Sequence, residues 1–191
     1  LLTVSMPFSD AGTNDTHSAV IDWGDKTTSM FESLTELFGS GTLNTDHVYA
    51  DNGPYVVTVT LTDDDGGSAI DSFEVKVNNV AATVNAGADQ NILEGQIVLL
   101  EAVFNDLGTL DTHTATIDWG DATPDKTASV REAAFGPPGS TAGMNGSVSG
   151  QHVYADDGKY TVTVTVTDDE GAERADTFLV TVHNAVPVIQ P

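Results

Sequence analysis

Residues Tyr160–Thr167 read YTVTVTVT, which is the clearest structural signal in the chain. Valine and threonine alternate strictly, so the two kinds of side chain point to opposite faces of an extended chain. Such a pattern of β-branched residues predicts an antiparallel strand with its valine face on a core and its threonine face in solvent. The next run, Phe178–Val182, alternates in the same way, and the Asp-Asp-Glu-Gly sequence between the two runs is typical of a turn. We therefore expect a β-hairpin here.

The sequence around this hairpin occurs twice. His47–Val77 aligns with His152–Val182 at an offset of 105 residues, with 19 of 31 positions identical. Phe8–Asp25 (FSDAGTNDTHSAVIDWGD) aligns with Phe104–Asp121 (FNDLGTLDTHTATIDWGD) at an offset of 96, with 13 of 18 identical. The difference between the offsets means that the second copy carries nine extra residues between the blocks, which we place in a loop. A duplication at this period predicts tandem modules.

The ends of the copies also repeat. Val75–Val84 closes one copy and opens the next, and Val180–Ile189 has the same pattern. Residues 80–96 have no counterpart ahead of Leu1, so we expect the first module to lack its N-terminal strand. The predicted organisation is a first module at 1–78, a second at 79–184, and the start of a third repeat at 185–191.

Each module is expected to contain about seven short strands. In Ala19–Trp23, Ala19, Ile21 and Trp23 share one parity and point inward, and residues 115, 117 and 119 repeat this pattern. Many short strands around one central tryptophan indicate an all-β fold of two immunoglobulin-like sandwiches. Ser29–Phe38 and Ser129–Phe135 are ambiguous, because their Ser-x-x-Glu openings are also typical of a helix cap. We favour a strand followed by an irregular loop.

Two motifs occur in both copies and resemble the PKD module, named for polycystic kidney disease protein. These are WGD (23–25, 119–121) and HVYADxGxYxVTVTxTDDxG (47–66, 152–171). The resemblance implies an immunoglobulin-like sandwich of the kind found in bacterial surface proteins and secreted hydrolases. There the module acts as a spacer, an adhesion element or a substrate-associating accessory, and some members bind calcium.

Composition excludes several classes of function. Six basic residues against 29 acidic ones give a net charge of −23, which disfavours binding to nucleic acid or anionic membranes. There is no apolar run of 18 residues, so we expect no membrane insertion. The absence of cysteine excludes disulfides and thiolate metal sites. No nucleophile elbow, HExxH motif or phosphate-binding glycine loop occurs, so we do not expect an enzyme.

Acidic loops are the candidate metal site. In an immunoglobulin-like sandwich, the loop after Phe8 and the hairpin turn after Thr62 lie at the same pole. By strand parity, Asp71 and Asp176 are expected to point inward near that pole. Calcium prefers six to eight oxygen ligands, and these loops could supply them. The alternative is that the aspartates are simply turn formers. The candidate ligands are Asp10, Asp15, Asp63, Asp64, Asp65 and Asp71 in the first copy, and Asp106, Asp111, Asp168, Asp169 and Asp176 in the second.

The histidines and the opposite pole are given other roles. We interpret His17 and His113 as hydrogen-bonding loop anchors rather than zinc ligands, and His47 and His152 as structural. At the opposite pole, Asp25 with Asp51 and Asn52, and Asp121 with Asp156 and Asp157, are expected to form turns and caps first. A cation there is a weaker alternative.

Two functions fit these features. The first is a non-catalytic extracellular or cell-surface repeat, stabilised by calcium and acting as a spacer or adhesion module. Its partners would be neighbouring repeats, other surface proteins or extracellular polysaccharide, and the chain itself is expected to be a monomer. The alternative is an accessory polymer-binding module of a secreted hydrolase, with Phe31, Phe38 and Phe135 as candidate contacts. The edge of the first module that lacks a strand could also be filled by Val186–Ile189 of a neighbouring molecule.

Overall fold

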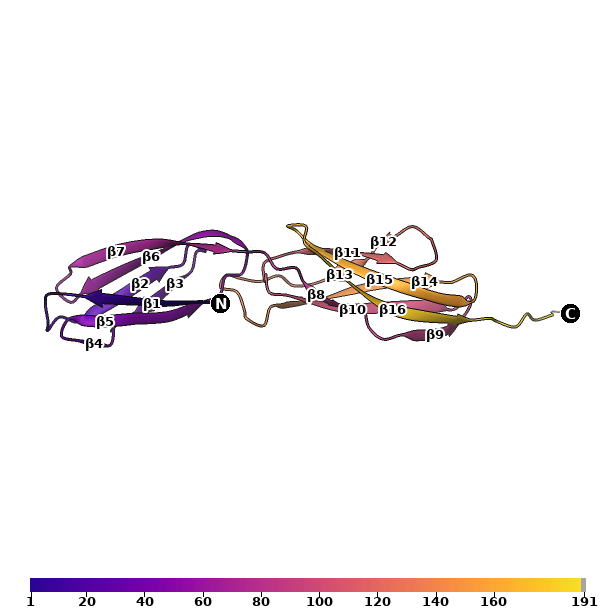
Figure 1. The fold of residues 1–191 in the computed structure, drawn as a ribbon, viewed down its shortest axis with the longest axis horizontal. Coiled ribbons are helices and arrows are strands. Elements are labelled where there is room, and N and C mark those ends of the chain that lie inside the picture. The colour runs from indigo at the N-terminus through magenta and orange to yellow at the C-terminus, as the bar shows by residue number, and fades with distance from the viewer. Residues whose placement is uncertain (190–191) are drawn as a thin grey trace. The chain divides into compact units, whose positions relative to one another are not determined.

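The structure, a computed structural model, describes residues 1–189 and contains sixteen β-strands in four sheets (Figure 1). Over this described range the chain forms no helix long and apolar enough to cross a membrane. Contacts divide the chain into two compact units. The first comprises Leu1–Asn79 together with Gly108–Leu110 and Phe135–Ala142, and the second comprises the rest of the described chain. The predicted all-β class is confirmed.

The first unit is a sandwich of two antiparallel sheets. One sheet has the strand order β1-β5-β4 and the other the order β3-β2-β6-β7. Its buried core centres on Ile21, Trp23 and Val57, and side chains from both sheets contribute to it. The seven strands are β1 (Leu2–Ser9), β2 (His17–Asp22), β3 (Thr28–Phe31), β4 (Glu36–Leu37), β5 (Ser40–His47), β6 (Gly53–Asp63) and β7 (Ser68–Val77).

The second unit has the same plan with two additional strands at its beginning. Its sheets have the orders β13-β14-β10-β8 and β12-β11-β15-β16-β9. All pairings are antiparallel except that of β9 with β16, which is parallel. The strands are β8 (Thr83–Asn85), β9 (Gln90–Leu93), β10 (Ile97–Asp106), β11 (His113–Asp118), β12 (Lys126–Thr127), β13 (Ser129–Arg131), β14 (Met144–Val153), β15 (Gly158–Asp168) and β16 (Glu173–His183).

The valine–threonine alternation is realised as predicted. Val162, Val164 and Val166 of β15 are buried, and the threonines between them lie toward the other face. The predicted hairpin is β15–β16, in which Val162 lies opposite Phe178. The two ambiguous segments contain short strands and no helix, so the strand interpretation is confirmed. The nine extra residues fall between β13 and β14, in a stretch without strands.

The WGD motif ends its strand with a turn that requires glycine. Gly120 has a φ of 74°, and a Cβ atom there would collide with the backbone of Thr161 on the neighbouring strand. The side chain of Trp119, 1% exposed, fills the core and stacks on the ring of His152. Nε2 of His152 lies 2.7 Å from Oδ2 of Asp121, so the last residue of the motif orients the histidine. The structural role expected for His152 fits this geometry.

Candidate metal centre

Two strand ends and a loop bring carboxylates together at one pole of the second unit. Asp106 ends β10, Asp111 lies in the loop that follows, and Asp168 ends β15. The first residue of β11, His113, lies opposite Asp168 in the antiparallel register, so the loop containing Asp111 sits beside the end of β15. An oxygen atom of each of the three aspartates lies within 4.8 Å of the others.

This carboxylate cluster is almost completely buried. Asp106, Asp111 and Asp168 are 1%, 2% and 5% exposed. Three buried carboxylates at this spacing repel one another, and their desolvation penalises the charged form. A local hydrogen bond offsets part of the cost of burying Asp168, because its Oδ1 accepts a bond of 2.7 Å from the backbone N–H of Ala172. A set of carboxylate oxygens at this spacing fits the ligand preference of a hard divalent cation.

A buried histidine links the cluster to a fourth carboxylate. Nε2 of His113 lies 3.1 Å from Oδ2 of Asp106, and Nδ1 lies 2.8 Å from Oε2 of Glu132. The backbone N–H of His113 also donates to Oε1 of Glu132 at 2.9 Å. Burial by itself lowers the pKa of His113, but its bonds to Asp106 and Glu132 and their negative charges outweigh this effect and raise it. Because both ring nitrogens are engaged by carboxylates, this histidine acts as a loop anchor.

The first unit repeats the site in a more exposed form. Asp10, Asp15 and Asp63 have oxygen atoms within 4.8 Å of one another, and all three are half-buried. Burial, together with the negative charges of Asp10 and Asp63–Asp65, raises the pKa of Asp15 above its ordinary value. His17 bridges Asp10 at 3.2 Å and Glu36 at 2.7 Å, as its counterpart does in the second unit. The grouping of acidic loops expected from the sequence is therefore present in both units.

The remaining predicted ligands lie around these clusters rather than at their centres. Oδ1 of Asp64 accepts a hydrogen bond from the N–H of Thr16, and Oδ1 of Asp169 accepts one from Thr112. Asp169 also belongs to a second acidic group with Asp111 and Glu170. Asp65 is exposed on the β6–β7 turn. These contacts are those of residues that shape the acidic loops.

Asp71 lies on the predicted face, opposite the core-packed Val59, but it is not buried there. Its side chain is exposed, and its Oδ1 accepts a hydrogen bond from the N–H of the next residue, Ser72. Its counterpart Asp176 is half-buried, but its Oδ2 accepts a 2.9 Å hydrogen bond from the N–H of Ala86, just after β8. Neither aspartate is grouped with the clustered carboxylates. Asp176 lies opposite the buried Val164, so strand parity gave its face correctly, and its partner Ala86 follows a strand of the facing sheet.

At the opposite pole, the aspartates of the WGD motif form turns and orient histidines. Oδ1 of Asp121 accepts hydrogen bonds from the N–H and hydroxyl of Thr123, and Asp25 does the same for Thr27. Burial raises the pKa of each aspartate, but these bonds and the neighbouring histidine outweigh it and hold the pKa below 3.8. A separate acidic group at this end of the second unit consists of Glu94, Asp156 and Asp157.

The sequence interpretation missed the two glutamates. Glu36 and Glu132 bond equivalent histidines, but each lies in a segment where the copies diverge. A signal was available, because the two residues keep the same 96-residue offset as the blocks that contain the histidines. Continuing that offset past the WGD motif would have aligned them.

The fold and this acidic pole define a class: an immunoglobulin-like sandwich with paired acidic loops at one end. A family described as the PKD domain matches residues 79–182, which is more than half of the chain. The chain therefore belongs to the PKD domain family. Domains of this family are typically non-catalytic and extracellular. No curated protein matches the chain.

Two solved structures illustrate the similarity to known proteins. Red sea bream transglutaminase is 11% identical, with a TM-score of 0.37; the match covers 95% of this chain and 29% of the transglutaminase chain. The BIgI domain of the beta protein from S. agalactiae, solved bound to CEACAM1, is 16% identical, with a TM-score of 0.31. That match covers 56% of this chain and 98% of the domain.

Proposed function

We propose that this chain is a non-catalytic repeat of an extracellular or cell-surface protein, in which calcium stabilises each module. The observation that carries the proposal is the buried cluster of Asp106, Asp111 and Asp168. Three carboxylate groups held this close repel one another, and a divalent cation held by their oxygens would replace that repulsion with attraction. The half-buried cluster of the first unit would bind the same ion with more water in its coordination shell.

The chemistry of the cluster favours calcium over other metals. The neighbouring histidine has both ring nitrogens engaged by Asp106 and Glu132, which removes the nitrogen ligand that zinc prefers. Magnesium demands near-ideal octahedral geometry and usually retains several waters, whereas calcium accepts irregular sets of carboxylate and carbonyl oxygens. A buried site built from two strand ends and a loop suits calcium better than magnesium.

A bound cation would have a mechanical effect. It would join Asp106 at the end of β10 to Asp168 at the end of β15, and so tie the two sheets of the sandwich together at one pole. Modules stiffened in this way serve as spacers or adhesion elements. The expected partners are neighbouring repeats of the same protein, other surface proteins or extracellular polysaccharide.

Thermal unfolding tests this function directly. The chain is melted in EDTA, then with excess calcium, and then with excess magnesium at the same ionic strength. A site saturated at 100 times its dissociation constant adds about 2.7 kcal/mol, which raises the melting temperature of a domain of this size by several degrees. We expect that rise with calcium only. No shift, or an equal shift with both ions, would assign the aspartates to turn formation and solubility.

A second candidate function is an accessory polymer-binding module. It is favoured by the exposure of Phe38, which is 75% exposed, and of Phe135, which is 44% exposed; Phe31 is half-buried. Exposed aromatic rings stack on sugars, so cosedimentation with insoluble polysaccharides tests this function. Loss of cosedimentation in Phe38→Ala, with an unchanged melting temperature, would support it. No binding by the wild-type chain would contradict it.

A further inference from the structure

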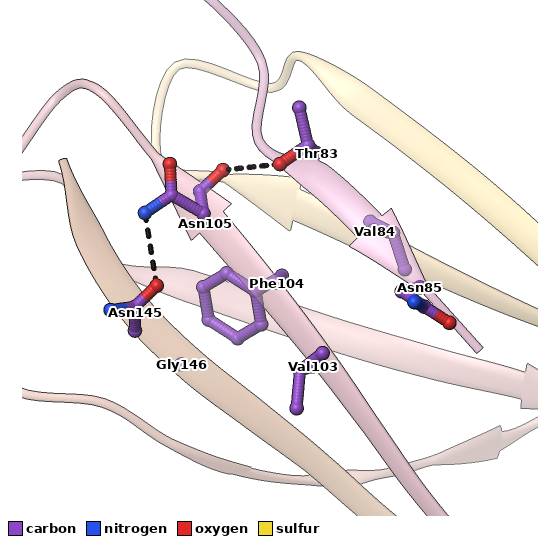
Figure 2. Close-up of a pocket in the computed structure, with 8 residues that line it drawn as sticks. All are labelled: Thr83, Val84, Asn85, Val103, Phe104, Asn105, Asn145 and Gly146. Atoms are coloured by element: carbon purple, nitrogen blue, oxygen red, sulfur yellow. Dashed lines mark hydrogen bonds between the residues drawn. The ribbon is translucent and has the colours of Figure 1, made fainter. Parts of the chain in front are cut away.

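The second unit has an open hollow on the outer face of the sheet that contains β8, β10 and β14. Its volume is about 500 Å³, and Asn85, Val103, Asn105 and Asn145 are among the residues that line it (Figure 2). Val103 is 55% exposed, whereas its neighbours along β10 are buried in the core. A second hollow of about 410 Å³ shares Asn145 with the first and continues to Arg131 on β13. The two hollows form one groove across the four strands of this sheet, which we call the asparagine groove.

The amide side chains of this groove are held in fixed orientations. Nδ2 of Asn105 donates a 3.0 Å hydrogen bond to Oδ1 of Asn145, as Figure 2 shows. Oδ1 of Asn85 accepts a 3.0 Å bond from the backbone N–H of Gly87. An asparagine side chain carries two N–H donors besides its oxygen. Because Asn85 and Asn145 are held through their oxygens and are exposed, their Nδ2 groups can donate to a ligand.

The strand pairing itself does not require these amides. Asparagine is depleted in β-strands, so three asparagines on three neighbouring strands call for a reason beyond the fold. In the first unit, the positions of Asn105 and Asn145 are taken by Ser9 and Ser40, which lie opposite each other in the same antiparallel register. Both units form this strand pair, and only the second places amides on it. The difference points to a ligand of the second unit.

The floor of the groove is apolar. Val103 lies opposite Asn85 in the strand register and shares the outer face of β10 with Asn105. The ring of Phe104 lies against Gly146, where a Cβ atom would collide with it. Glycine inside a strand often marks a place where another group approaches the backbone closely. An apolar floor with a few placed polar groups is the usual composition of a site for a ligand that is polar but largely uncharged.

Charge selects a neutral ligand for this groove. Its lining holds one cation, Arg131, and one anion, Glu132, whose two carboxylate oxygens are engaged by His113. The chain as a whole carries a charge of −23, so an anionic polymer is repelled from every face. A cationic ligand would collect at the acidic loops rather than beside Arg131.

We propose that the asparagine groove binds a neutral, hydroxyl-rich polysaccharide. Sugar hydroxyls accept hydrogen bonds from Nδ2 of Asn85 and Asn145, and the C–H face of a sugar ring packs on Val103. The groove crosses four strands spaced about 4.8 Å apart, a span of about 14 Å, which suits several linked sugars better than one. This proposal rests on the polymer-binding candidate function and moves its contact surface from the exposed phenylalanines to the groove.

Cosedimentation of the full chain with chitin and with cellulose tests the proposal, with alginate gel as an anionic contrast. Val103→Gln puts a polar side chain on the floor, and Asn145→Asp keeps the oxygen that accepts from Asn105 but removes the Nδ2 donor. Leu99→Gln is the matched control, because Leu99 is a 64% exposed residue on the same face of β10 and does not line the groove. Thermal melts check that each variant is folded.

We expect the wild type to bind at least one of the two neutral polymers and to bind alginate much more weakly. Val103→Gln and Asn145→Asp should each weaken binding by about 2- to 10-fold, the effect of losing one hydrogen bond or a small apolar contact. Leu99→Gln and Phe38→Ala should bind as the wild type does. Chemical shifts of the side-chain amides of Asn85 and Asn145 should move when soluble chitin or cellulose oligosaccharides are added.

The failures of the groove and of the polymer-binding function can be told apart. A wild type that binds neither chitin nor cellulose would overturn both. Binding that is lost in Phe38→Ala but kept in Val103→Gln and Asn145→Asp would overturn the groove and leave the polymer-binding function standing. Equal weakening in Leu99→Gln, or binding to alginate as strong as to the neutral polymers, would also overturn the assignment of a neutral ligand to this groove.

Discussion

Replacing Asp111 by asparagine should change stability in opposite directions with and without calcium. In the metal-free chain, Asp111→Asn removes one of three buried charges whose oxygens lie within 4.8 Å of one another. At an effective dielectric constant of about 20, two charges at that distance repel by about 3.5 kcal/mol. The relief has an upper limit, because protonating a carboxyl group of ordinary pKa at pH 7 costs only about 4 kcal/mol. We expect a gain of about 1 to 4 kcal/mol in EDTA.

With saturating calcium the variant lacks a charged ligand and should lose most of the stabilisation that the ion gives the wild type, about 2.7 kcal/mol at 100 times the dissociation constant. The assay is a thermal or urea melt of the wild type and the variant in both conditions. In a domain of this size, 1 kcal/mol corresponds to roughly 4 to 8 °C. Asp125→Asn, an exposed residue outside the acidic groups, is the control and should change little in either condition. Equal destabilisation of Asp111→Asn in EDTA and calcium would refute the reasoning, since it would make Asp111 a loop anchor.

Three further outcomes follow from the geometry of the second unit. Gly120→Ala should lower the free energy of unfolding by about 3 kcal/mol in urea melts, because it adds left-handed backbone strain to a collision with the neighbouring strand. Gly171→Ala, with a φ of 85° and open space around its Cβ position, should lower it by only about 1 kcal/mol. Tyr154→Phe should lower the free energy of unfolding by about 1 to 2 kcal/mol, because the buried hydroxyl of Tyr154 donates a 2.7 Å hydrogen bond. Tyr160→Phe should lower it by less, because the 3.2 Å hydrogen bond of Tyr160 is exposed, and equal losses would contradict this reasoning. The lowered pKa of Asp121 gives stability that is present above about pH 4 and is lost as the pH falls through its folded value. The cost of Asp121→Asn in denaturant melts, about 1 to 3 kcal/mol at pH 7, should therefore shrink as the pH is lowered below about 4, and a cost that does not change with pH would contradict the linkage.

Local patterns predicted most of the fold. The alternation in Tyr160–Thr167 indicated β15 and its buried face, and the turn residues after it indicated the β15–β16 hairpin, because both signals act within a few residues. The core position of Trp119 followed from parity in the same way. The grouping of acidic loops at one pole followed from the alternation of strand ends in a sandwich, which needs only the order of the strands.

The contacts that the sequence did not reveal are those between distant segments. The hydrogen bond between Ala86 and Asp176 joins residues 90 positions apart, and no periodicity within either segment reports it. The Glu132–His113 pair spans 19 residues and a loop of divergent sequence. Side-chain partners of this kind depend on the tertiary path that brings distant segments together, and neither local propensity nor alternation encodes that path.

The two units show that the same motif acquires different chemistry from its surroundings. Phe104 and Phe178 are buried in the second unit, while their counterparts Phe8 and Phe73 are only half-buried. The second unit has β8 beside β10 and β9 beside β16, and the described part of the first unit has no strand at either position. The carboxylate clusters follow the same trend, being buried in one unit and half-buried in the other.

Burial raises the free-energy cost of an unneutralised charge. A strand that covers the edge of the core therefore also raises the cost of leaving the carboxylate cluster without a cation. By this reasoning the second unit depends more strongly on a cation than the first.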